Sequence, residues 1–188
     1  MQSDTGAVRV FAGIELPPTV RDHLATALAM ASPPRTTRDP WIPAANWHLT
    51  LGFFGEQPEG ILDELTQSLR LAASQTRPFT LSLAGAGTFR HDVCWIGVSD
   101  PTEALGPLAD KVRDTYATGH QHAQNRFHVT VSRAGRQARL ADTMAALSVY
   151  QGPTWTVREI TLFESILGEG VGGHPLYRPL CTVGFGES

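Results

Sequence analysis

Residues 47–56 read WHLTLGFFGE, and residues 126–135 read RFHVTVSRAG. Each stretch holds a histidine, an apolar residue, a threonine and a second apolar residue, in that order. The two histidines, His48 and His128, lie far apart in a chain of 188 residues. The question is whether these are two ordinary strands that carry histidine or two halves of one active site.

Both stretches alternate apolar and polar residues, which is typical of a strand with one buried face. Residues i and i+2 of a strand point to the same side. His48 therefore shares a face with Thr50, and His128 shares a face with Thr130. The residues between them are expected to face a core: Leu49, Leu51, Val129 and Val131.

The elements around the two motifs repeat in the same order: strand, helix, histidine-bearing strand, helix, strand. The first series covers residues 8–89, with helices expected after Pro17–Pro18 and over 59–73 and a closing strand at 79–89. The second covers residues 92–165, with helices expected from 101 and over 138–150 and a closing strand at 154–165. A final strand is expected at 176–185, after a glycine-rich turn at 168–173 that lacks the GK[ST] of a phosphate-binding loop.

This repetition of order predicts an α+β fold with two lobes related by a pseudo-two-fold axis. The chain length suits a single domain over residues 1–188 with the two lobes sharing a core. Under that symmetry the two histidine motifs meet in one cleft between the lobes.

The composition limits the class of protein. The hydrophobic fraction of 41% and the charged fraction of 18% are those of a globular protein. A net charge of −3 gives no basic field for long nucleic acid, although a local site for a short or terminal one needs few positive groups.

The N-terminal residues do not resemble a signal peptide and no segment is long and apolar enough to span a membrane, so a cytoplasmic location is expected. Cys94 and Cys181 are expected to be buried free thiols.

Two histidines beside one phosphate can act as general base and general acid, because an ordinary imidazole pKa is about 6.5. The hydroxyls of Thr50 and Thr130 can donate hydrogen bonds to phosphoryl oxygens. Arg133, just after the second motif, can supply a positive charge to the phosphate.

Other interpretations of the histidines are weaker. A single histidine on a strand is usually a hydrogen-bonded surface residue, but two in matched positions favour a function. A zinc site lacks a third Cys, Asp or Glu at ligand spacing, so neither a metal nor a cofactor is expected. The remaining histidines are expected to be solvated or hydrogen-bonded: His23, His91, His120, His122 and His174. Phe11, Phe53 and Phe127 could stack on a terminal base, although core positions are the ordinary expectation for each.

These residues resemble the 2H phosphoesterase superfamily and, within it, the bacterial and archaeal RNA 2′,3′-cyclic phosphodiesterase family, also called 2′-5′ RNA ligase. The resemblance covers nearly the whole chain. It rests on RVFAGIELP at 9–17, WIPAANWHLTLGFFGE at 41–56, VCWIGV at 93–98, FHVTVSR at 127–133 and LFES at 162–165 followed by Tyr177. Two positions depart from the family pattern: Phe127 stands where proline is frequent, and Gly52 where a lysine or another long residue is common.

The resemblance implies a cleft between two antiparallel sheets with helices outside, and metal-independent hydrolysis of a 2′,3′-cyclic phosphate to a 2′-phosphate. It implies that His128 activates water, that His48 protonates the leaving 3′ oxygen, and that Thr50, Thr130 and Arg133 hold the phosphoryl oxygens. The reverse reaction would join RNA ends by a 2′-5′ linkage.

The implied partners are RNA ends or nucleotides with a 2′,3′-cyclic phosphate, and the expected state is a monomer without an obligate protein partner. Candidate substrates include tRNA fragments, other RNA, ADP-ribose cyclic phosphate and small nucleotides. The alternative is a non-catalytic module that binds nucleotides or RNA ends on the same scaffold; it predicts degraded motifs, whereas both motifs are intact.

Overall fold

The computed structural model describes residues 6–32, 41–90, 92–114, 126–134 and 140–186. The strands are β1 (Ala7–Glu15), β2 (His48–Pro58), β3 (Phe79–Phe89), β4 (Val93–Ser99), β5 (His128–Ser132), β6 (Gln151–Val157), β7 (Glu159–Ile166) and β8 (Leu176–Gly184). The α-helices are α1 (Pro18–Ala31), α2 (Leu62–Ser74), α3 (Leu105–Asp114) and α4 (Ala141–Ala146). Short 3₁₀ turns cover Ala44–Asn46, Glu59–Ile61, Leu147–Val149 and Val171–Gly173.

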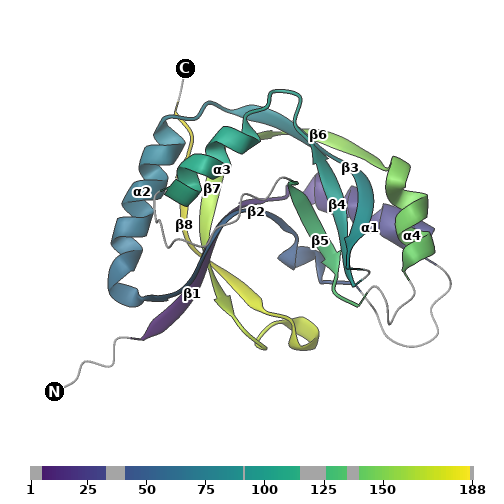
Figure 1. Ribbon diagram of the computed structural model, residues 1–188, viewed down its shortest axis with the longest axis horizontal. Helices are drawn as coiled ribbons and strands as arrows, with labels where there is room; N and C mark the ends of the chain where they lie inside the picture. The colour runs from purple at the N-terminus through teal and green to yellow at the C-terminus, as the bar shows by residue number, and fades with distance from the viewer. Residues whose placement is uncertain (1–5, 33–40, 91, 115–125, 135–139, 187–188) are drawn as a thin grey trace.

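The strands form two four-stranded sheets, with orders β2-β1-β7-β8 and β5-β4-β3-β6, and every neighbouring pair is antiparallel. Figure 1 shows the two sheets as the two halves of the molecule, with helices on their outer sides. The predicted α+β fold with two lobes is confirmed.

The two sheets correspond strand by strand. In each, the histidine-bearing strand lies at an edge, and its inner neighbour is the first strand of the corresponding series. The helices after those first strands exchange: α1 follows β1 but packs on β6 of the other sheet, and α3 follows β4 but packs on β2. Helix α2 covers β7 and β8, and α4 covers β3. The matching exchange in both halves is what a pseudo-two-fold relation produces.

Two expectations about the strands are wrong. The segment 154–165, expected as one strand, is two strands in different sheets, β6 and β7, with the break at Arg158. Strand β3, expected to close the first series, pairs with β4 and β6 in the second sheet. The series 8–89 and 92–165 therefore do not coincide with the two sheets, because β3 and β7 each cross to the other one.

The core confirms the expected helical faces. Helix α1 begins directly after Pro17, with proline at its first position, and buries Val20, Leu24 and Leu28 on one side. Each such leucine or valine contributes about 1.5–3 kcal/mol relative to an exposed position. Helix α2 likewise buries Leu65 and Leu69. Together with the inner faces of both sheets these residues form one connected hydrophobic cluster.

Both cysteines are free thiols, as expected, but only Cys94 is buried. Cys181 is partly exposed, because it lies on β8, which is an edge strand of its sheet. Among the helices of the described residues, none is long and apolar enough to cross a membrane.

Gly13 on β1 allows a close approach to β2 at the position of the first motif. It lies opposite Thr50, next to an irregularity in the ladder, and a Cβ atom there would stand 2.7 Å from the carbonyl oxygen of Leu49. We expect Gly13→Ala to lower the free energy of unfolding by about 1–3 kcal/mol, because backbone must shift to admit the methyl group. Urea titration measures the change. Gly60→Ala is the control, since nothing lies within 4 Å of its Cβ position; equal values for the two variants would contradict the close-approach account.

Candidate active site

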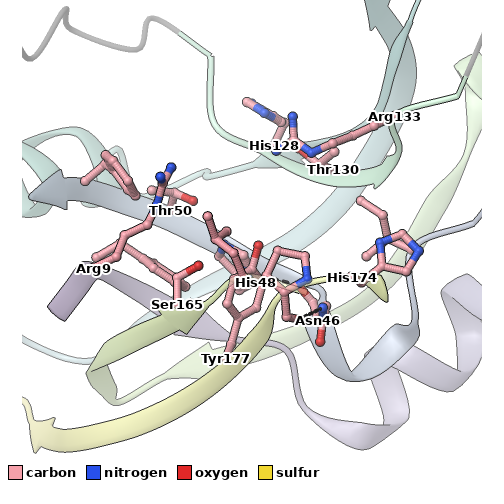
Figure 2. Close-up of a pocket in the computed structure, with 15 residues that line it drawn as sticks. Arg9, Asn46, His48, Thr50, His128, Thr130, Arg133, Ser165, His174 and Tyr177 are labelled. Atoms are coloured by element: carbon pink, nitrogen blue, oxygen red, sulfur yellow. Dashed lines mark hydrogen bonds between the residues drawn. The ribbon is translucent and has the colours of Figure 1, made fainter. Parts of the chain in front are cut away.

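One cavity of about 400 Å³ opens between the two sheets. The five residues expected at the site all line it: His48, Thr50, His128, Thr130 and Arg133. Figure 2 shows His128, Thr130 and Arg133 on one wall, and His48 and Thr50 on the facing side. Two motifs that are distant in the sequence thus meet at one cleft.

The strand alternation places these side chains as expected. Leu49 and Val129, which directly follow the two histidines, are 0% exposed, whereas the histidines themselves are only half-buried. Arg133 follows immediately after the end of β5 and is exposed. Because Arg133 lies beyond the strand, the in-and-out alternation of β5 does not set the direction of its side chain, which lines the cavity from the end of the strand.

A backbone hydrogen bond between the lobes holds the two motif strands together. The amide of Ile42, in the segment leading to β2, donates to the carbonyl oxygen of Val131 on β5 at 2.8 Å. The segment that leads to His48 is therefore held against β5, the strand that carries His128.

Each histidine is oriented in the same way by the backbone two residues before it. His48 Nδ1 lies 2.8 Å from the carbonyl oxygen of Asn46, and His128 Nδ1 lies 3.0 Å from that of Arg126. A carbonyl oxygen only accepts, so Nδ1 carries the proton and donates in both rings. Nε2 is then the nitrogen that each ring has available for the cleft, and in the neutral ring it is a proton acceptor.

Aromatic rings surround both imidazoles. The His48 ring lies 4.7 Å from Phe11 and 5.0 Å from Tyr177, the latter edge-on. The His128 ring lies 5.1 Å from Phe89, also edge-on, and 6.3 Å from Trp95. These rings remove water from the inner side of each imidazole.

This burial lowers the pKa of both histidines. The pKa of His48 falls from its ordinary 6.5 to about 4, chiefly because burial disfavours the charged form; the Asn46 carbonyl opposes the change, and the charges of Arg133 and His128 add to it. The pKa of His128 is also lowered, first by burial and then by the charges of Arg133 and Arg126, against the Arg126 carbonyl. Both rings are therefore mainly neutral at pH 7.

The cleft also contains residues that the motif analysis did not assign. Arg9, Asn46, Ser165, His174 and Tyr177 line the cavity. Asn46 Nδ2 donates to the Pro175 carbonyl oxygen at 2.7 Å, which holds the segment after the glycine-rich turn against the wall. His174, expected to be solvated, thereby becomes part of the wall.

One sequence signal points to Arg9: at steps of two along its strand, it shares a face with Phe11 and Gly13. Phe11, considered as a stacking residue, is only 3% exposed and lies under His48. Phe53 is 42% exposed and lines the cavity, whereas Phe127 lies outside the cavity wall and packs on the core.

The other histidines lie apart from the two motifs or outside the described residues. His23 Nδ1 forms a 2.9 Å hydrogen bond with the Tyr150 hydroxyl, in agreement with the ordinary structural role expected of it. His91, His120 and His122 lie outside the described residues. Within the described part of the chain, no group of three His, Cys, Asp or Glu side chains is arranged to hold a metal ion.

Comparison with known proteins agrees with this architecture. The sequence is 32% identical over 169 residues to the RNA 2′,3′-cyclic phosphodiesterase of Escherichia coli strain K12, covering 86% of this chain and 89% of that protein. It is 26% identical over 169 residues to the protein of the same name from Methanothermobacter thermautotrophicus, covering 85% and 91%. A crystal structure of E. coli LigT complexed with 3′-AMP matches with a TM-score of 0.72 at 28% identity, over 97% of this chain and all of the other (100%).

A cleft between two antiparallel sheets, with one histidine motif on each, is what the resemblance to the 2H phosphoesterases implies. The family model of the 2′-5′ RNA ligase superfamily matches residues 16–169. The chain belongs to this superfamily.

The lowered pKa of His48 makes the stability of the fold depend on pH. The unfolded chain binds a proton at this histidine below pH 6.5, whereas the folded protein does so only near pH 4. The free energy of unfolding therefore falls as pH drops from about 6.5 to 4, by a few kcal/mol at most. Chemical unfolding of the wild type and of His48→Gln over this range measures it. The variant should show a smaller slope, because the contribution of His48 is removed; identical slopes would contradict the burial account.

Proposed function

We propose that this protein is an RNA 2′,3′-cyclic phosphodiesterase that hydrolyses 2′,3′-cyclic phosphate ends of RNA or nucleotides to 2′-phosphates without a metal. The observation that carries the proposal is the pair of imidazoles, one from each lobe, that line one cavity with Arg133 and have their Nδ1 atoms, not Nε2, bonded to backbone. The names of the relatives in E. coli and M. thermautotrophicus support the same activity.

The proton transfers balance with two histidines. Neutral His128 takes a proton from water as the water oxygen attacks phosphorus, and the bond between phosphorus and the 3′ oxygen breaks. Protonated His48 gives its proton to the leaving 3′ oxygen. The product is a 2′-phosphate with a free 3′ hydroxyl, and a proton returns from His128 to His48 through solvent. The assignment of base and acid follows the family resemblance.

The substrate itself supplies the condition for this pair to work. His48 by itself is neutral near pH 7, because burial and Arg133 disfavour its charged form. A bound phosphodiester brings a negative charge, and an opposite charge within a few ångströms raises an imidazole pKa. Binding of the phosphodiester therefore favours uptake of a proton by His48. The acid is charged when the phosphate is bound.

Thr50, Thr130 and Arg133 complete the proposed phosphate site. Both hydroxyls share a strand face with the neighbouring histidine and line the cavity. The Arg133 charge acts on both imidazoles, so it lies within electrostatic reach of the point between them. These groups would hold the phosphoryl oxygens and stabilise the charge that builds up there in the transition state.

The same arrangement supports the reverse reaction, with the 5′ hydroxyl of a second RNA end in the place of water and a 2′-5′ linkage as product. Water at its bulk concentration favours hydrolysis. A non-catalytic role as a nucleotide-binding module is disfavoured by the two intact histidine motifs.

Replacement of either histidine tests the proposal. We expect His48→Ala and His128→Ala each to lower kcat by about 10²–10⁴-fold, because each removes one proton-transfer group. The assay is conversion of adenosine 2′,3′-cyclic phosphate to adenosine 2′-phosphate in the presence of EDTA. His23→Ala is the matched control, since His23 contacts Tyr150 away from the cavity, and it should retain activity. Near-normal kcat in either cleft variant would exclude that histidine, and loss of all activity in EDTA would exclude the metal-free mechanism.

The pH dependence tests the acid–base pair. In the free enzyme both pKa values are lowered, so the bell-shaped profile of kcat/KM should have its maximum below pH 6.5. Arg133→Gln removes a charge that lowers both pKa values, so its bell should move to higher pH as its rate falls. Arg133→Lys keeps the charge and should keep the bell in place, yet still lose rate because the planar fork is gone. A profile that rises to a plateau through pH 9 would contradict the pair.

A further inference from the structure

A second arginine enters the cleft at a different place from Arg133. Arg9 lies on β1, and its guanidinium carbon stands 4.8 Å from the centre of the Phe53 ring. Figure 2 shows it on the side of the pocket with Thr50 and Ser165, away from the wall of His128 and Arg133. The packing on Phe53 fixes the plane of the guanidinium at the cavity wall.

The structure leaves the Arg9 side chain with unused donors. Its Nε atom is buried and has no acceptor among the described residues. Glu56 lies opposite Arg9 in the β1–β2 ladder, but within the described part of the chain the two form no ion pair. A buried polar group without a partner is unfavourable, and an anion in the cavity would give the guanidinium the partner that it lacks.

The charge of Arg9 acts on a different point of the cleft from that of Arg133. The charges that lower the pKa of His48 are those of Arg133 and His128, and those that lower the pKa of His128 come from Arg133 and Arg126. Arg9 acts instead on Tyr177: burial raises the pKa of that hydroxyl, and the charges of Arg133 and Arg9 oppose the rise. Tyr177 therefore lies within electrostatic reach of both arginines, of which Arg133 is the one assigned above to the reacting phosphate.

We propose that Arg9, seated on Phe53, forms a second anion subsite that binds the 5′-phosphoryl group of the nucleotide whose 2′,3′-cyclic phosphate is hydrolysed. The inference rests on the proposed function and names the substrate class of that site. A 5′-phosphoryl group lies across the same ribose from the cyclic phosphate, so one nucleotide presents two anions to the two arginines. The Arg9 fork can hold phosphoryl oxygens through two parallel hydrogen bonds, and the Ser165 hydroxyl can donate another.

Two kinds of substrate carry this group. In an RNA chain it is the phosphodiester to the preceding nucleotide, and in a small nucleotide it is a 5′-phosphate monoester. Recognition by Arg9 needs no contact with a base. The subsite therefore favours nucleotides with a 5′-phosphoryl group, whichever base they carry.

Three substrates with the same cyclic end test the subsite: adenosine 2′,3′-cyclic phosphate, its 5′-phosphorylated form, and the ApA dinucleotide with a 2′,3′-cyclic end. We expect the wild type to have a kcat/KM about ten-fold or more higher for the last two, as for a charge-assisted hydrogen-bonded contact. Arg9→Gln should reduce this ratio to near one, and Arg9→Lys should keep part of it. If only the monoester is preferred, the natural ligand is a small nucleotide; preference for the dinucleotide as well points to RNA.

Arg178→Gln is the matched control. Arg178 is the neighbour of Tyr177 on β8, does not line the cavity, and pairs with Glu164, so its loss should leave the ratio unchanged. Equal kcat/KM for all three substrates in the wild type, or an unchanged ratio in Arg9→Gln, would overturn the subsite while the proposed hydrolysis stands. No turnover of any substrate would overturn the hydrolysis and the subsite together. If Arg9→Gln folds poorly, the kcat/KM ratio of the wild type and that of Arg9→Lys still test the subsite.

Discussion

The packing of each sheet's helix on the other sheet is the constraint on which the cleft depends. The chain builds the second sheet from the consecutive strands β3 to β6 and then returns to the first sheet with β7 and β8, so the first sheet is completed only by the C-terminal strands. Helices α1 and α3 each pack on the sheet to which their preceding strand does not belong. The two lobes are therefore parts of one core, and the edge strands that carry His48 and His128 are held facing one another.

Within that frame the chemistry relies on the backbone more than on side-chain partners. Each imidazole is oriented by the carbonyl two residues before it, a bond set by the local path of the chain into the strand. The aromatic surroundings and Arg133 then lower the pKa of both rings. A site with two neutral imidazoles beside a positive arginine is suited to a phosphodiester, because the negative charge of the ligand favours protonation of an imidazole.

The positive charge of the cleft is local. The chain carries a net charge of −3, yet Arg9 and Arg133 both open into one cavity, and no carboxylate is among the described residues that line it. This arrangement attracts a compact anion and provides little field along a long polyanion, because screening limits exposed charges to about 10 Å at ordinary salt. The recognition of one nucleotide through two phosphoryl groups is consistent with such a field.

The sequence by itself determined what depends on neighbouring residues. Period-two alternation fixed the shared face of His48 and Thr50 and of His128 and Thr130, and the spacing of apolar residues fixed the buried side of α1. The break at Arg158 also left a trace in the sequence, because apolar residues fall on odd positions at Trp155 and Val157 and on even positions at Ile160 and Leu162. Both halves have equally strong strand character, so the segment resembles a single strand.

Only the tertiary structure decided what depends on contacts between distant segments. Which sheet a strand joins is set by its partners, so β3 and β7 could not be assigned from their own residues. Arg9 lies far along the chain from Ser165, and their common cavity follows from the pairing of β1 with β7. His174 joins the wall through the bond from Asn46 to Pro175, and Cys181 is partly exposed because its strand has no further neighbour. The physical reason is the same in each case: local pattern sets which way a side chain faces, and long-range packing sets what it faces.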